Sequence, residues 1–210
     1  MIEVSPPVSG LGARAVSTEE ATDQQAMQDS VLGPLVRVLE EAAGDQHWAL
    51  VGAAACRLQG VEVSSPNLEF ITTEPALQAL AEMLDTPSEW GRGAYLAAQR
   101  MQFTRDRVPV FIFGNPVFHG RYESLSPMDI PSLWDARRRI EVDGTNVLVM
   151  PLEWELLLAV LLDSSTRVEA LRTLMRENGF DGRLLTRLLR EGHVQPATEE
   201  AVWQQLEQRT

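Results

Sequence analysis

The sequence predicts a mixed α+β fold, in which a small mixed β-sheet is flanked by helices and followed by a C-terminal helical region. Short apolar runs alternate with helical patterns as far as Met150, and every element expected from Pro151 onward is helical. Hydrophobic residues make up 44% of the 210 residues and charged residues 23%, which is typical of a globular domain. We therefore expect a flexible tail over residues 1–24, an α/β core over 25–150 and a helical region over 151–210.

The first half of the core alternates helices and strands. Leucine and valine recur at helical spacing between Asp29 and Ala43, and Pro34 fits best in the first turn of that helix. The elements expected here are a helix over 29–43, a strand over 48–51, a helix over 53–58, a strand over 68–72 and a helix over 74–84.

The second half of the core is expected to be richer in strands. The run Val108–Phe113 is almost continuously apolar, as in a central strand covered on both faces, and Gly114, Asn115 and Pro116 should end it. Asp143-Gly144 is a typical hairpin turn. The expected elements are a short helix over 94–99, strands over 100–103 and 108–113, a short helix over 132–138 and a hairpin over 140–142 and 147–150.

The C-terminal region is expected to consist of helices over 152–162, 166–177, 182–191 and 198–208. Gly179 and Gly192 stand just after two of these patterns, where helices commonly end. Thr198 is expected to cap the last helix.

Composition excludes several classes of protein. The single cysteine, Cys56, excludes an intramolecular disulfide, and its apolar neighbours predict a buried, inert thiol. The sequence contains no apolar run long enough to span a bilayer and no recognisable secretion signal, so we expect a cytoplasmic protein that does not enter membranes.

The charged residues add a second exclusion. The net charge is −12, which disfavours nonspecific binding to nucleic acid. All 18 basic residues are arginine, because the sequence has no lysine. Schiff-base chemistry and a phosphate loop with a lysine are therefore excluded.

The segment Trp48–Thr73, WALVGAAACRLQGVEVSSPNLEFITT, is the most informative part of the chain. A short strand meets Gly52, a helix of small residues follows, and a second strand comes after Gly60. This order resembles the nucleotidyltransferase superfamily, in particular its small bacterial and toxin–antitoxin-associated members. Their pattern is strand, Gly-Gly or Gly-Ser, helix, glycine, and then Asp-x-Asp on the next strand.

A second segment, VDGTNVLVMPLEWELLLAVLLDSS with the helices after it, is similar to the closing part of the same family. The resemblance covers roughly residues 46–190. It implies that catalytic members bind a nucleoside triphosphate with Mg²⁺. The glycines let backbone N–H groups approach the phosphates, and three carboxylates on two strands hold two metal ions.

The glycine and serine positions match this pattern in part. Gly52 matches the first glycine, whereas Ala53 replaces the second Gly or Ser. Ser65 stands where Ser or Thr is usual, and Val63 takes the place of an arginine. The resemblance therefore implies that Gly52, Ala53 and Ser65 would contact a nucleotide cofactor.

The acidic positions depart from the pattern. Asn67 matches the first aspartate, Glu69 the second, and Pro109 is the best match for the third. Glu69 is then the one remaining candidate metal ligand, with one negative charge in place of three. Because Mg²⁺ needs several oxygen ligands, we expect no Mg²⁺ or nucleotide cofactor and no catalysis.

The leading hypothesis is a nucleotidyltransferase-fold protein that has lost catalysis and serves as a regulatory module that binds a nucleotide or a protein partner. One alternative is an active, metal-dependent transferase that moves a nucleoside monophosphate from a triphosphate, using Glu69 and another acid such as Glu62 or Asp106. A third reading is a structural protein that forms a homodimer through exposed leucines of its C-terminal half.

Other candidates carry less information. His47, His119 and His193 are far apart and show no metal-ligand spacing. The arginine cluster over residues 137–139 is either a solvated face or a grip for a phosphate or an acidic partner.

Overall fold

The computed structural model describes residues 18–44 and 46–207, and residues 1–17, 45 and 208–210 lie outside the described residues. The α-helices within the described residues are α1 (Thr18–Ala43), α2 (Gly52–Leu58), α3 (Glu74–Met83), α4 (Pro131–Asp135), α5 (Leu152–Leu161), α6 (Ser165–Asn178), α7 (Gly182–Glu191) and α8 (Pro196–Leu206), with a 3-10 turn over Pro127–Asp129. The strands are β1 (Trp48–Val51), β2 (Leu68–Thr72), β3 (Ser88–Arg92), β4 (Leu96–Arg105), β5 (Val108–His119), β6 (Ser124–Leu125), β7 (Arg138–Val142) and β8 (Thr145–Val149). This confirms the predicted mixed α+β class.

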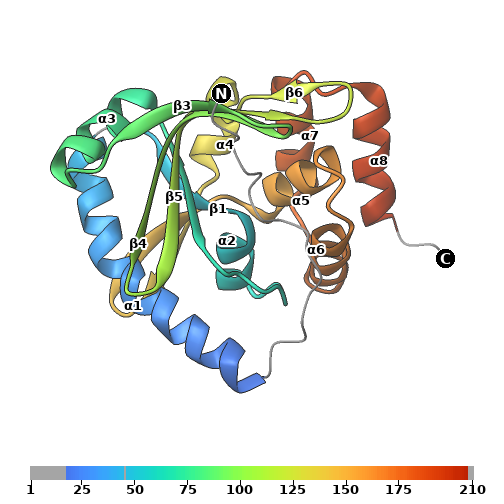
Figure 1. Ribbon diagram of the computed structural model, residues 1–210. Helices are drawn as coiled ribbons and strands as arrows, with labels where there is room; N and C mark the ends of the chain where they lie inside the picture. Colours follow the sequence, from blue (N-terminus) through green and yellow to red (C-terminus); the bar gives the residue numbers. More distant parts are fainter. Residues whose placement is uncertain (1–17, 45, 208–210) are drawn as a thin grey trace.

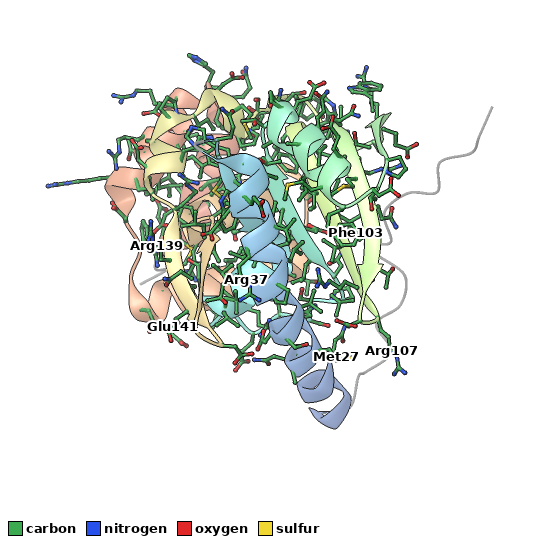
Figure 2. All side chains as sticks on the ribbon, turned by 90° about the vertical axis from the view of Figure 1, so that its left-hand side faces the viewer. Met27, Arg37, Phe103, Arg107, Arg139 and Glu141 are labelled. Atoms are coloured by element: carbon green, nitrogen blue, oxygen red, sulfur yellow. The ribbon has the colours of Figure 1, made fainter. Side chains whose placement is uncertain are left out.

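The strands form one mixed sheet in the order β3-β4-β5-β2-β1-β8-β7, and β6 pairs with the end of β5. Two pairs are parallel, β2 with β5 and β1 with β8, whereas the others are antiparallel. Helices cover both faces (Figure 1): α1 and α3 lie on one side, and α5 to α8 lie on the other. Figure 2 shows α1 crossing its face of the sheet, with Arg37 on the outer side.

Two apolar clusters hold these layers together. One joins α1 and α3 to the sheet, through residues such as Leu35, Leu77 and Ile112. The other joins the opposite face to the C-terminal helices, through residues such as Ile71, Trp154 and Leu188. The second cluster therefore crosses the predicted boundary at residue 150, although the division into three regions stays a prediction.

Helix α1 is longer than the sequence analysis predicted. It begins at Thr18 instead of Asp29, so Pro34 lies in its interior and not in its first turn. An interior proline removes one backbone hydrogen bond and costs about 3 kcal/mol. The helix continues because its apolar stripe, which includes Leu32 and Leu39, is fully buried against the sheet.

The helix predicted over residues 94–99 is wrong, because β3 and β4 form an antiparallel hairpin there. Residues on β4 pair with β5 along almost its whole length, with an irregularity between Ala97 and Gln99. The local sequence pattern did not reveal strand β4, because its pairing partner β5 lies further along the chain.

Strand β5 continues through Gly114, Asn115 and Pro116 to His119, so the predicted break is also wrong. A side chain at Gly114 would lie 3.1 Å from the Glu74 backbone, which explains how β5 and α3 pack closely. The strand is central, but it is not covered equally on both faces. Val108, Val110 and Ile112 are buried, whereas the residues between them are half-buried.

The hairpin at Asp143-Gly144 is confirmed, with positive φ at both turn residues (47° and 75°). The four C-terminal helices are also confirmed. The predicted cap of the last helix is wrong, because α8 begins at Pro196 and Thr198 donates a hydrogen bond to Glu123 instead. No helix among the described residues combines the length and apolar content that a membrane span requires.

Gly120 directly follows β5 and packs closely against Leu161 of α5. An added Cβ would lie 2.6 Å from Leu161 Cδ1 and 2.8 Å from the Leu161 carbonyl oxygen. We expect Gly120→Ala to lower the free energy of unfolding by about 1–3 kcal/mol in chemical denaturation, because the backbone contact cannot be relieved by a side-chain rotation. Gly93→Ala is the matched control, since its Cβ would meet nothing closer than 3.7 Å. Equal stability of the two variants would contradict this packing.

Candidate functional site

The site predicted from the sequence lies where β1 passes into α2. Val51, the last residue of β1, pairs with Glu69 on β2, so the glycine turn and the acidic position are adjacent. Gly52 has φ +72°, a backbone conformation that L side chains rarely adopt. An added Cβ at Gly52 would lie 2.8 Å from Glu69 Oε2. The turn therefore requires glycine for its backbone conformation, and an added side chain would also force the Glu69 carboxylate to shift.

Glu69 is half-buried and does not stand alone. Asn67 Nδ2 donates a hydrogen bond to Glu69 Oε1 at 3.0 Å. Asn67 thus turns the donor end of its amide toward the acid. Two residues that match the Asp-x-Asp positions are brought together, but as a neutral donor and its acceptor.

A second carboxylate at this turn escaped the sequence analysis. Glu155, in the first turn of α5, is fully buried, and its Oε1 accepts a hydrogen bond from the Gly52 N–H at 2.9 Å. This is the N–H that the resemblance assigns to a phosphate. The signal in the sequence was two acids, Glu153 and Glu155, inside the otherwise apolar run that starts α5.

Arg167, near the start of α6, supplies the positive charge. Its Nη1 lies 4.0 Å from Glu155 Oε2, and its side chain is only 25% exposed. Glu155 Oε2 is buried and accepts no hydrogen bond from the described residues. Glycine, two glutamates and an arginine thus come together from four separate elements: the β1–α2 turn, β2, α5 and α6.

Burial dominates the protonation of both acids. It raises the pKa of Glu155 to about 7, against the opposing effects of Arg167 and the Gly52 N–H, while the neighbouring Glu69 raises it further. Burial also raises the pKa of Glu69, and the charge of Arg167 and the Asn67 hydrogen bond oppose that shift. Burial, followed by Glu155, raises the pKa of the Cys56 thiol, which agrees with the predicted buried cysteine.

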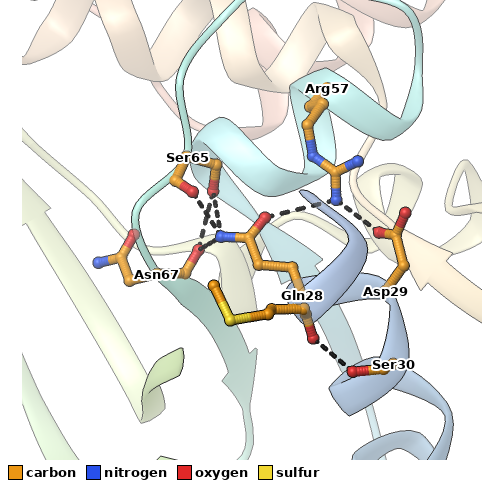
Figure 3. Close-up of polar contacts among 7 residues, drawn as sticks. Gln28, Asp29, Ser30, Arg57, Ser65 and Asn67 are labelled. Carbon is orange, nitrogen blue, oxygen red and sulfur yellow. Dashed lines mark hydrogen bonds and ion pairs between the residues drawn. The ribbon is translucent and has the colours of Figure 1, made fainter. Parts of the chain in front are cut away.

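The loop before β2 is tied to α1 by a polar network (Figure 3). Gln28 is buried, and its Nε2 donates to the carbonyl oxygens of Ser65 at 2.5 Å and Asn67 at 3.4 Å. Arg57 forms an ion pair with Asp29 at 2.7 Å. The Ser65 hydroxyl donates to the Asn67 carbonyl oxygen at 2.8 Å, so within this structure it orders the loop.

The remaining predicted positions, Ala53 and Pro109, and the neighbouring Val63 carry no polar side chain. Ala53 is half-buried in the first turn of α2, and Val63 packs against the apolar cluster under α5. Leu68 pairs with Val110 in the parallel register, which places Asn67 beside Pro109 and Glu69 beside Phe111. The position next to the acid on β5 is therefore aromatic.

The residues present do not fit a two-metal centre. Within residues 18–44 and 46–207, no group of three or more His, Cys, Asp or Glu side chains is placed to hold a metal ion. Glu62 and Asp106, the alternative acids, are both exposed, and Asp106 lies in the turn that joins β4 to β5. The acid that approaches Glu69 at Gly52 is instead Glu155.

Four of the other candidate residues, His47, His119, Arg137 and Arg138, have partners within the chain. His47 stacks on Trp134 at 4.6 Å, and Arg137 lies over the same ring while donating to the Trp48 carbonyl oxygen. His119 contacts the Ser124 hydroxyl. Of the arginine cluster, Arg137 is thus part of the packing, whereas the side chain of Arg138 is half-exposed beside Glu153.

The shifted pKa of Glu155 predicts how stability depends on pH. Its ordinary pKa is 4.5 and its pKa in the folded protein is about 7, so between these values the folded state binds more protons. The free energy of unfolding should therefore fall as the pH rises from about 4.5 to about 7. Glu155→Gln keeps an acceptor for the Gly52 N–H, and should reduce this fall by the order of 1–3 kcal/mol.

Urea denaturation across this pH range measures the effect. Glu141→Gln, an exposed position on β7, is the control and should keep the wild-type slope. If Glu155→Gln and the wild type gave parallel curves, the buried ionisable group would not be Glu155.

Comparison with known proteins identifies the fold. No family model matches the chain, and no curated protein matches its sequence. Among solved structures, the chain is similar to a provisionally named nucleotidyltransferase from Thermotoga maritima, with a TM-score of 0.53 and 18% identity over 71% of this chain and 95% of that one. An antigenic nucleotidyltransferase-like protein from Paracoccidioides brasiliensis matches with a TM-score of 0.45 and 15% identity over 85% and 93% of the two chains. The first of these likenesses shows that the chain has a nucleotidyltransferase-like fold.

Proposed function

We propose that this protein keeps the nucleotidyltransferase-like fold without two-metal catalysis, and that it serves as a binding or regulatory module. One observation carries this proposal: the Gly52 N–H already donates to a buried carboxylate of the chain itself, Glu155. A phosphate bound by that N–H would first have to displace Glu155 from the position.

Electrostatics oppose such a displacement. Two like unit charges 4 Å apart repel by about 4 kcal/mol at the effective dielectric of a protein surface. A triphosphate that approached Gly52 would face Glu155 and Glu69, with one guanidinium, Arg167, to offset them. Without metal ions between the carboxylates and the phosphates, the ionised carboxylates at this turn oppose the binding of a triphosphate.

The metal ions are themselves disfavoured. Asn67 is neutral and directs its N–H₂ group, not its carbonyl oxygen, toward Glu69. Pro109 has no oxygen in its side chain, and Phe111 lies beside Glu69 on the adjacent strand. This arrangement supports a silent site over an active one.

The Gly52 N–H is already hydrogen-bonded to Glu155, which favours a protein over a nucleotide as the ligand of this module. The face of β5 beside the site carries Pro109, Phe111 and Phe113, all half-buried, with the two phenylalanine rings stacked 6.4 Å apart. Apolar and aromatic side chains that remain partly accessible are typical of surfaces that contact other proteins. The resemblance to toxin–antitoxin-associated members suggests a small helical partner.

The active-transferase alternative rests on one specific observation, that Glu155 is a second carboxylate at the same turn as Glu69. A pair of acids could hold one metal ion if the local positive charge were removed. The homodimer alternative receives less support, because the leucines of α7 at positions 184, 185, 188 and 189 are buried in the chain's own core.

Calorimetry and a turnover assay separate the two leading readings. We expect no heat of binding when MgATP is titrated into the purified protein, and no release of pyrophosphate from any nucleoside triphosphate with Mg²⁺ or Mn²⁺. Glu69→Ala should behave in the same way as the wild type in both assays. Metal-dependent binding of ATP that Glu69→Ala weakens, or any turnover, would overturn the silent module in favour of the enzyme.

A further inference from the structure

We infer that the guanidinium of Arg167 takes over, in this site, the charge-balancing role of a divalent cation, and that it thereby excludes metal ions. This inference rests on the proposed function, because it explains what neutralises the carboxylates of a silent site. It assigns a role to a residue that the resemblance does not match with any functional position.

Burying the carboxylates of Glu69 and Glu155 carries a free-energy cost. Glu155 is fully buried and Glu69 half-buried, and an ionised carboxylate without a compensating charge is strongly destabilising inside a protein. Among the ion pairs of the described part of the chain, Arg167 is the one cation within 4.0 Å of either acid. The guanidinium therefore balances the ionised form of these acids, the role that a metal ion has in a metal-dependent relative.

Arg167 lies in an unfavourable position on its own helix. It is the third residue of α6, which begins at Ser165. A cation in the first turn of a helix opposes the helix dipole and is unfavourable there. Arg167 is nevertheless three-quarters buried and directed toward Glu155 and not into solvent. The carboxylates at Gly52 account for that orientation.

One oxygen of Glu155 has no hydrogen-bond donor among the described residues. Glu155 Oε1 accepts the hydrogen bond from the Gly52 N–H, whereas Glu155 Oε2 accepts none from the described residues and lies 4.0 Å from Arg167 Nη1. Glu69 Oε2 also lies close to this glycine, because an added Cβ at Gly52 would come within 2.8 Å of it. Without the guanidinium, two carboxylates beside one glycine would present oxygen ligands of the kind that Mn²⁺ and Mg²⁺ prefer.

The test is a gain of metal binding. Arg167→Met keeps much of the buried aliphatic volume and removes the charge. We expect this variant to bind Mn²⁺ about tenfold or more tighter than the wild type in calorimetry, because one repelling charge near the site is gone. Adding Glu69→Gln to Arg167→Met should abolish the gain. Arg172→Met, which removes an arginine from the same helix that pairs with Glu169, is the matched control and should bind Mn²⁺ like the wild type.

Stability provides a second measurement if Arg167→Met folds poorly. Millimolar Mn²⁺ should then raise the melting temperature of Arg167→Met, and leave those of the wild type and Arg172→Met unchanged. An Arg167→Met variant that neither binds Mn²⁺ more tightly nor is stabilised by it overturns the inference. So does a wild type that binds Mn²⁺ tightly and loses it on Glu69→Gln. Turnover of a nucleoside triphosphate by the wild type would instead overturn the proposed function, so the two failures are distinguishable.

Discussion

The hydrogen bond from the Gly52 N–H to Glu155 links the two halves of the chain. It connects residues 103 positions apart, and it fixes the start of α5 against the turn between β1 and α2. Because Glu155 is fully buried, this bond and the charge of Arg167 stabilise its ionised form against the burial that raises its pKa. The packing of the C-terminal helices on the sheet and the chemistry of the glycine turn therefore depend on the same carboxylate.

The remaining features of the turn follow from that constraint. A residue with a side chain at position 52 would collide with Glu69 and would strain the backbone, so the glycine is required whether or not a phosphate ever binds. The loop before β2 is likewise set by internal contacts, since Gln28 on α1 holds the Ser65 and Asn67 carbonyl oxygens. Contacts within the chain thus account for the glycine at position 52, although the motif resembles a phosphate-binding turn.

Local patterns predicted much of this fold. The strand–glycine–helix unit, the hairpin at Asp143-Gly144 and the C-terminal helices each have a signal within a few residues of sequence. Strand β3 and the full length of β5 were not predicted, because their pairing partners lie elsewhere in the chain. For the same reason Gly52, Asn67 and Glu69 could be predicted from local sequence but Glu155 and Arg167 could not, since their place at the turn depends on how α5 and α6 dock.

The residues that meet at the Gly52 turn are also difficult to replace one at a time without loss of stability. Replacing Glu155 with an apolar residue would leave the Gly52 N–H without its acceptor, which costs about 1–3 kcal/mol, and the Arg167 charge without its partner. Removing Arg167 would leave two acids facing one glycine. A coordinated apolar replacement could be neutral, but each single step toward it is unfavourable. The carboxylates at this turn can therefore persist for stability alone, and their presence is no argument that the site still performs phosphate chemistry.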